Sequence, residues 1–144
     1  MARCAVATRS SAISTTLRGP SLYATTTVRP QIREIGIFNT TSTAVAVAVA
    51  RATSAGTQGA GLTEVCESDD SHVPLATGFN THTADCAVNA QEKQASLGAA
   101  IGSGVIWTWG PGEFILTNAA TDGIVIFCPT GTGQIVDFYI VWEE

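Results

Sequence analysis

Hydrophobic and polar positions alternate most regularly between residues 31 and 57. Val45, Val47 and Val49 fall on one face of an extended segment, and alanines fall on the other face. This period of two is typical of a β-strand, whereas valine at every second position of a helix would not form one stripe. A second β-rich run, residues 32–38, precedes the polar segment Asn-Thr-Thr-Ser-Thr. The pattern predicts a β-hairpin with a longer loop.

Further β-rich runs follow, separated from one another by Gly, Pro, Asn or Asp. Strands are expected at residues 62–66, 104–109, 113–116, 124–128 and 134–142, and an extended segment at 76–84. Residues 91–100 offer at most one helical turn, because Gly98 and Gly102 disfavour a longer helix. The spacing of the turns therefore predicts an all-β protein, an antiparallel β-sandwich or jelly-roll-like barrel of about 8 to 10 strands.

Residues 1–30 have fewer apolar positions and are rich in Ser, Thr, Ala and Arg. Residues 2–8 and 22–28 have the composition of strands, with Gly19-Pro20 as a turn between them. We expect this segment to form an extended N-terminal arm or edge strands, and residues 31–144 to form the β-sandwich domain. Removal of residues 1–30 would then leave the domain folded.

The composition is that of one domain with a weakly charged surface. A chain of 144 residues can bury roughly two-thirds of its unfolded surface. Only 13% of the residues are charged, which suits a protein packed among neighbours. The first 20 residues lack the apolar core of a signal peptide, and the alanine-valine run is shorter than the ~20 residues of a membrane-spanning helix. We therefore expect a soluble protein made in the cytosol, with no membrane partner.

Opposite charges are segregated along the chain, although the net charge is only −5. All but one of the seven basic residues lie in the first 51 positions, where Glu34 is the only acid. Either the fold mixes the two sets, or a basic arm docks on an acidic surface of another copy or another protein. Nucleic acid is a weaker candidate, because the acidic remainder would repel phosphate. The candidate interface residues are Arg3, Arg9, Arg18 and Arg29 with Glu64, Glu67, Asp69 and Asp70.

Residues with catalytic or metal-binding chemistry are few and scattered. Their spacing matches no compact zinc or calcium site, so we expect a solvated acidic loop with no metal or cofactor. The sequence lacks the Gly-x-Ser-x-Gly elbow of serine hydrolases, and residues 131–134 lack the lysine of a phosphate-binding loop. We therefore expect no enzymatic activity. The residues with ligand chemistry are His72, His82, Asp69, Asp70 and Asp85.

The four cysteines are widely separated in a chain that already has a core. Buried free thiols are therefore the default expectation for Cys4, Cys66, Cys86 and Cys128. A bridge between Cys66 and Cys86, which would close the acidic loop, is the alternative.

Several segments carry a resemblance to a known group of proteins. They are residues 33–41 (REIGIFNTT), 56–60 (GTQGA), 102–109 (GSGVIWTW), 131–137 (GTGQIVD) and 141–144 (VWEE). Together they resemble small virion-associated proteins encoded by tailed bacteriophages. The resemblance implies an all-β virion structural protein of the capsid decoration or cement type, assembled in the host cytoplasm. It implies binding to the major capsid protein or other virion proteins and self-association, with a trimer as the expected state. No catalytic residues carry over.

Two other functions fit the same sequence. A tail, fibre or head-to-tail joining protein would have the same composition and would differ in copy number. A carbohydrate-binding module would use Trp107 or Trp109, which share one face of a predicted strand and offer a large apolar area for stacking on a sugar. Core packing of at least one of these rings is the simpler interpretation.

Overall fold

The protein is all-β in a computed structural model that describes residues 1–144. It contains ten strands, which confirms the predicted fold class and strand number. No helix that could cross a membrane is formed. The strands are β1 (Arg3–Arg9), β2 (Ser21–Tyr23), β3 (Gln31–Asn39), β4 (Val45–Ala52), β5 (Glu64–Cys66), β6 (Thr77–Phe79), β7 (Val88–Leu97), β8 (Gly104–Thr108), β9 (Gly123–Phe127) and β10 (Val136–Glu143).

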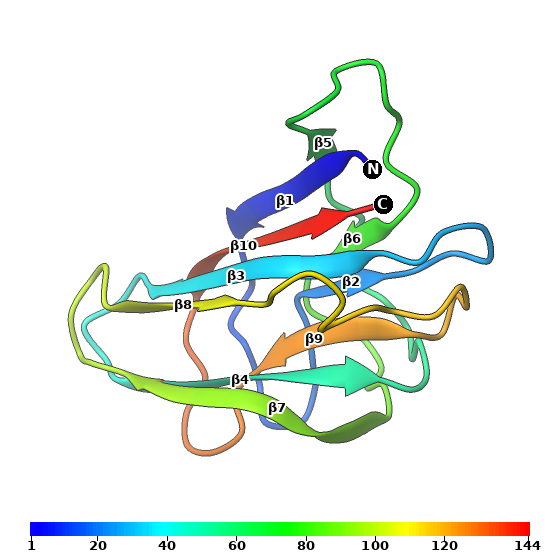
Figure 1. The fold of residues 1–144 in the computed structure, drawn as a ribbon. Helices are drawn as coiled ribbons and strands as arrows, with labels where there is room; N and C mark the ends of the chain where they lie inside the picture. Colours follow the sequence, from blue (N-terminus) through cyan, green and yellow to red (C-terminus); the bar gives the residue numbers. More distant parts are fainter.

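The strands form two antiparallel sheets that pack face to face (Figure 1). Sheet A has the order β5-β1-β10-β3-β8, and sheet B has the order β6-β2-β9-β4-β7. When β5 and β6 are left out, eight strands remain, and they can be numbered 1 to 8 along the chain. In this numbering sheet A has the order 1-8-3-6 and sheet B has the order 2-7-4-5. This is the double Greek key of a jelly roll. β5 and β6 are an insertion that widens each sheet by one strand at the same edge.

The predicted hairpin of residues 31–57 is not formed. β3 pairs with β10 and β8 in sheet A, whereas β4 pairs with β7 and β9 in sheet B. The polar segment between them crosses from one sheet to the other, and Asn39 anchors it by donating from Nδ2 to the carbonyls of Thr43 (2.6 Å) and Gly98 (3.1 Å). Ile35 and Ile37 of β3 and Val47 and Val49 of β4 are buried in the same core, where the two strands meet because the two sheets stack.

The main core lies between the two sheets. Val45, Val47 and Val49 of β4 point into it, and Trp142 of β10 is its largest fully buried side chain. Ala48, Ala50 and Ala52 of β4 belong to a smaller cluster on the outer side of sheet B, which includes Cys86. The period of two therefore identified the two faces of β4 correctly, and the small alanines allow a covering segment to pack closely against the strand.

Residues 1–30 are not an arm, so the expected division into 1–30 and 31–144 is wrong. β1 lies between β5 and β10, and β2 lies between β6 and β9, so neither is an edge strand. Cys4, Val6 and Leu22 are buried members of the main core. The apolar residues of this segment are few, but they fall on the inner faces of central strands. A side chain there is buried because of its position in the sheet, however few apolar residues the segment contains.

Two further segments differ from the sequence prediction. Residues 91–100 were expected to form at most a helical turn, but most of them belong to the ten-residue edge strand β7, Val88–Leu97. Residues 113–116 form a turn with one isolated bridge, between Gln31 and Ile115, instead of a strand. β7 is exposed along most of its length, so it lacks the alternation of apolar residues by which a strand is recognised.

Candidate functional site

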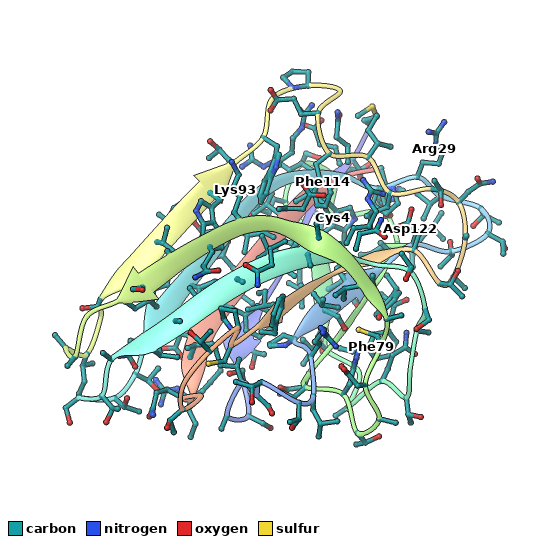
Figure 2. The ribbon with its side chains drawn as sticks, turned by 90° about the horizontal axis from the view of Figure 1, so that it is seen from below. Cys4, Arg29, Phe79, Lys93, Phe114 and Asp122 are labelled. Carbon is teal, nitrogen blue, oxygen red and sulfur yellow. A yellow bond between two sulfur atoms is a disulfide. The ribbon has the colours of Figure 1, made fainter.

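Five of the six N-terminal arginines make ion pairs within the chain. Each pair joins an arginine from the first 51 residues to an acid from the remainder, so the fold itself mixes the segregated charges. Arg29 has no such partner and lies exposed on the loop between β2 and β3 (Figure 2). The pairs are Arg3 with Glu67, Arg9 with Asp137, Arg18 with Asp85, Arg33 with Glu143 and Arg51 with Asp122.

The four acids predicted for an interface lie in β5 and in the loop of residues 67–76 that follows it. Glu64 Oε1 accepts a hydrogen bond from the Gly78 amide (2.5 Å), which links β5 to β6. Asp69 accepts hydrogen bonds from the hydroxyl (2.6 Å) and the amide (3.0 Å) of Ser71, and these lower the pKa of Asp69. Asp70 is exposed. Two of the four acids, Glu64 and Asp69, therefore make contacts within the insertion itself, and Glu67 pairs with Arg3 of β1.

Glu144 holds the 67–76 loop against the body of the protein. Its side chain has no exposed surface. It accepts hydrogen bonds from His72 Nε2 (2.9 Å), the amides of Leu75 (2.7 Å) and Ala76 (3.1 Å), and Trp142 Nε1 (3.0 Å). Burial alone would raise the pKa of Glu144, but these hydrogen bonds outweigh it and hold the pKa below its usual range. The carboxylate is therefore a fully satisfied buried charge.

A disulfide joins Cys4 of β1 to Cys66 of β5, which are directly opposite each other in the paired strands. Cys86 and Cys128 are free and buried, and burial raises the pKa of both thiols. The expectation of free thiols is therefore wrong for the first two cysteines and confirmed for the other two. The alternative bridge between Cys66 and Cys86 is not formed. A separation of 62 residues gives no local signal for the pairing, which follows from the sheet order.

His72 lies beside this disulfide. One ring nitrogen of His72 and the two Sγ atoms all lie within 4.8 Å of one another. An open cavity of about 460 Å³ adjoins the group. The cavity is lined by Met1, Ala2, Ser68, Asp69, His72 and Glu144.

The other histidine has different neighbours, so the candidate ligand residues are not brought together. His82 Nε2 lies 3.1 Å from Ser21 Oγ, and His82 Nδ1 has no hydrogen-bond partner. Asp85 pairs with Arg18 and does not orient the imidazole ring. Ser21 and His82 are 0% and 2% exposed, so no substrate reaches the hydroxyl and the pair lacks the third group of a catalytic triad. Burial lowers the pKa of His82, although Asp85 opposes the shift.

Trp107 and Trp109 are both half-buried and pack against the main core. Trp109 stacks on Phe114 with ring centroids 5.4 Å apart, and Lys93 Nζ lies 5.4 Å from the centroid of the Trp109 ring. Arg51 covers the Phe114 ring at 4.8 Å. Figure 2 shows Lys93 and Phe114 on the side of the molecule where β7 passes the segment after β8. These rings and cations cover the space between the β7 and β8 edges.

The outer face of sheet A carries an apolar band, with the ion pair of Arg9 and Asp137 at one end of the paired strands and that of Arg33 and Glu143 at the other. A row of residues crosses four strands in register, because Ala7 is paired with Tyr139, Tyr139 with Gly36, and Gly36 with Ile106. Val65 and Ile106 are 56% and 53% exposed. Isolated exposed apolar residues are common on proteins, whereas large contiguous apolar patches are a feature of interaction sites.

The aromatic residues of this face are held rigidly. Gly36 leaves room for the Tyr139 ring, because a Cβ atom at this position would overlap the ring. Tyr139 stacks with Phe38 at 6.3 Å and donates from its hydroxyl to Glu34 Oε1 (2.5 Å). Burial, followed by this hydrogen bond, raises the pKa of Tyr139 to about 12. The face therefore presents fixed rings, and the one carboxylate beside them, Glu34, accepts a hydrogen bond from the Tyr139 hydroxyl.

The comparisons with known proteins give no further guide to the function. No protein-family model, no curated protein and no solved structure matches this chain. The sequence analysis did not identify the outer face of sheet A. Its signal was present in β10, where apolar residues occupy both alternating faces between residues 138 and 142.

Proposed function

We propose that this protein is a structural component of a tailed-bacteriophage virion and decorates the capsid shell as a symmetric oligomer. The observation that carries the proposal is a jelly roll with an apolar, aromatic outer face on sheet A. Jelly rolls are common in viral capsid and lectin domains. The sequence resemblance to virion-associated proteins supports the virion over a lectin-like role.

The outer face of sheet A has the chemistry of a protein-binding surface. The core of such a surface is depleted in charge and enriched in aromatic residues. Tyr139 and Phe38 meet this description, and both rings are already fixed by packing within the chain. A rigid surface loses little conformational entropy on binding. Many weak contacts of this kind, repeated over a shell lattice, add up to stable attachment.

The predicted interface arginines have a different role in this proposal. Arg3, Arg9 and Arg18 already pair with acids of the same chain. Attachment through them would first have to break these pairs, with little net gain because ion pairs near the surface contribute weakly. We therefore assign the shell contact to the apolar face. The arginines border this face or lie elsewhere, where they stabilise the monomer.

Copy number and one pair of variants test the proposal. Quantitative mass spectrometry of purified virions should give a ratio to the major capsid protein near one, or a simple lattice fraction. Ile106→Lys places a charge on the outer face of sheet A and should remove the protein from the particle. Gln94→Lys places the same charge on the exposed edge strand β7 of sheet B and should leave incorporation unchanged.

Each other outcome contradicts a defined part of the proposal. A ring-sized copy number would place the protein in the neck or tail, and absence from the particle would exclude a virion role. Normal incorporation of Ile106→Lys would contradict the outer face of sheet A as the contact. Circular dichroism of both variants confirms that the added charge has not unfolded the domain.

A further inference from the structure

The geometry points to a metal site that forms when the disulfide is reduced, with Cys4, Cys66 and His72 as ligands for zinc or a similar thiolate-binding ion. Two thiolates and one imidazole are a typical protein donor set for zinc. The three residues come from β1, from β5 and from the 67–76 loop, and only the fold brings them together.

The distances require only a small adjustment. The three ligand atoms lie within 4.8 Å of one another. Zinc–sulfur bonds of about 2.3 Å and zinc–nitrogen bonds of about 2.0 Å place tetrahedral ligand atoms roughly 3.5 to 3.8 Å apart. Once the bond between them is broken, the two sulfurs must separate from the ~2 Å of a disulfide bond to about 3.8 Å, and the imidazole ring must approach them. Because Cys66 lies on a short edge strand, this adjustment does not disturb the centre of sheet A.

The surroundings of His72 are those of a metal ligand. Histidine ligands commonly donate their other ring nitrogen to a carboxylate, which fixes the orientation of the ring. Nε2 of His72 already has such a partner in Glu144 Oε1, 2.9 Å away, so the proposed ligand atom is Nδ1. Glu144 is itself held by three further hydrogen bonds, so it is a fixed acceptor. The adjoining cavity, which Asp69 also lines, leaves room for a fourth ligand.

Reduction and metal binding are linked because the disulfide and the two thiolates are alternative states of the same sulfurs. A small thiol attacks Cys66, whose sulfur is on the partly exposed residue of the pair, and Cys4 leaves as the thiolate. A second thiol then releases Cys66, so that two small thiols are oxidised to one disulfide while the protein gains two thiols. Metal binding displaces the remaining thiol protons.

Each of the two states would keep β1 joined to β5, and each would form in a different compartment. Disulfides persist in oxidising surroundings and are reduced in the cytosol. In the cytosol the metal would hold the two strands and the 67–76 loop together, and after oxidation the covalent bond would replace it. This inference does not depend on the proposed virion role, since it concerns only the sulfurs and the imidazole of one chain.

Cobalt(II) is the probe for this site, because its thiolate complexes absorb strongly in the near ultraviolet and its tetrahedral complexes absorb in the visible. The full-length protein, reduced and then freed of excess thiol, should bind one equivalent of cobalt with both signatures. Zinc should displace the cobalt. The oxidised protein should show neither signature.

Variants assign the ligands and separate binding from folding. His72→Ala should weaken cobalt binding at least tenfold, and its oxidised form, with the disulfide intact, shows whether the variant folds. Glu144→Gln should weaken binding by about tenfold through the orientation of the ring. Cys66→Ser should abolish the thiolate absorption. The matched control is the double substitution Cys86→Ser and Cys128→Ser, which removes the two free thiols and should leave the spectrum unchanged.

Thermal unfolding provides a readout that does not depend on the spectrum. Zinc should raise the melting temperature of the reduced protein and have no effect on the oxidised protein, because a ligand stabilises only the state that binds it. The inference is overturned if the reduced protein binds no cobalt. It is also overturned if His72→Ala binds cobalt as tightly as the unmodified chain, or if zinc fails to stabilise the reduced form.

Discussion

Glu144 and His82 show how differently two buried polar side chains can be accommodated. The Glu144 carboxylate has four hydrogen-bond partners, two side chains and two backbone amides of the same chain. His82 makes one hydrogen bond, to Ser21, and keeps a buried ring nitrogen without a partner. A partly satisfied buried polar group costs stability. His82 is therefore the residue at which acid should first weaken the fold.

We expect stability to fall as the pH drops below about 6.5, the ordinary pKa of histidine in an unfolded chain. Because burial lowers the pKa of His82 in the folded state, the unfolded chain binds more protons between the two pKa values. Stability therefore decreases through this window on acidification and levels off below the folded pKa. Glu144, whose folded pKa is also lowered, adds a separate loss at more acidic pH.

Urea unfolding midpoints between pH 7.5 and pH 5 measure this effect. His82→Gln removes the titrating group and should flatten the curve between pH 7.5 and pH 5.5, whatever its effect on the absolute midpoint. An equal slope in the two proteins would show that His82 does not cause the acid sensitivity.

The sequence identified the chemically interesting residues better than it identified their partners. It singled out His72, His82 and the cysteines, but it placed both histidines in one solvated loop. In the structure His72 lies beside the disulfide, and His82 lies within hydrogen-bond distance of the buried Ser21 hydroxyl. Partners such as Cys4 and Ser21 lie about 60 positions away in the sequence, where no local spacing rule applies.

Among the elements, β4 shows both the strength and the limit of pattern reading. The alternation of valine and alanine predicted its span and its two faces correctly, because side-chain direction in a strand is a local property. Its partners were predicted wrongly. Pairing depends on which strands the sheets bring together, and a hairpin signal cannot exclude a crossing between two stacked sheets.

Val47→Ala should measure the contribution of the inner face of β4. Val47 is fully buried in the main core, so loss of two methyl groups and the resulting cavity should lower the free energy of unfolding by about 2 kcal/mol. Gln94→Ala, on the exposed strand β7 next to β4, should change it by less than about 0.5 kcal/mol. Equal effects in chemical denaturation would contradict the assignment of the inner face.

At the scale of the whole molecule, the fold class was predictable and the domain division was not. The turn spacing of the later chain was sufficient to predict a sandwich or jelly roll. The first 30 residues were misjudged because a central strand of a two-layer sheet needs only a few apolar side chains on one face. The charge segregation pointed to contact between distant parts of the chain, and the structure realises that contact within one molecule.

Deletion of residues 1–30 should therefore prevent folding. It removes β1 and β2, which lie inside the two sheets, and leaves their neighbours without partners. The deleted chain should lack the far-ultraviolet β signal and should aggregate through its open strand edges. If the deletion variant were soluble and unfolded cooperatively, residues 31–144 would be an independent domain and residues 1–30 an arm, as the sequence predicted. The triple substitution Arg3→Ala, Arg9→Ala and Arg18→Ala is the matched control, and it should fold because surface ion pairs contribute little.

The place of β10 in sheet A also determines when a nascent chain can fold. Of the ten strands described, β10 is made last, yet it lies between β1, which is made first of the ten, and β3. Until residue 143 has been synthesised, β1 and β3 have no common neighbour and the core lacks Trp142. Sheet A therefore closes only after the last of its five strands has been made. Chains released early would carry unpaired strands on both sides of the gap, a feature by which chaperones and proteases distinguish incomplete products from finished ones.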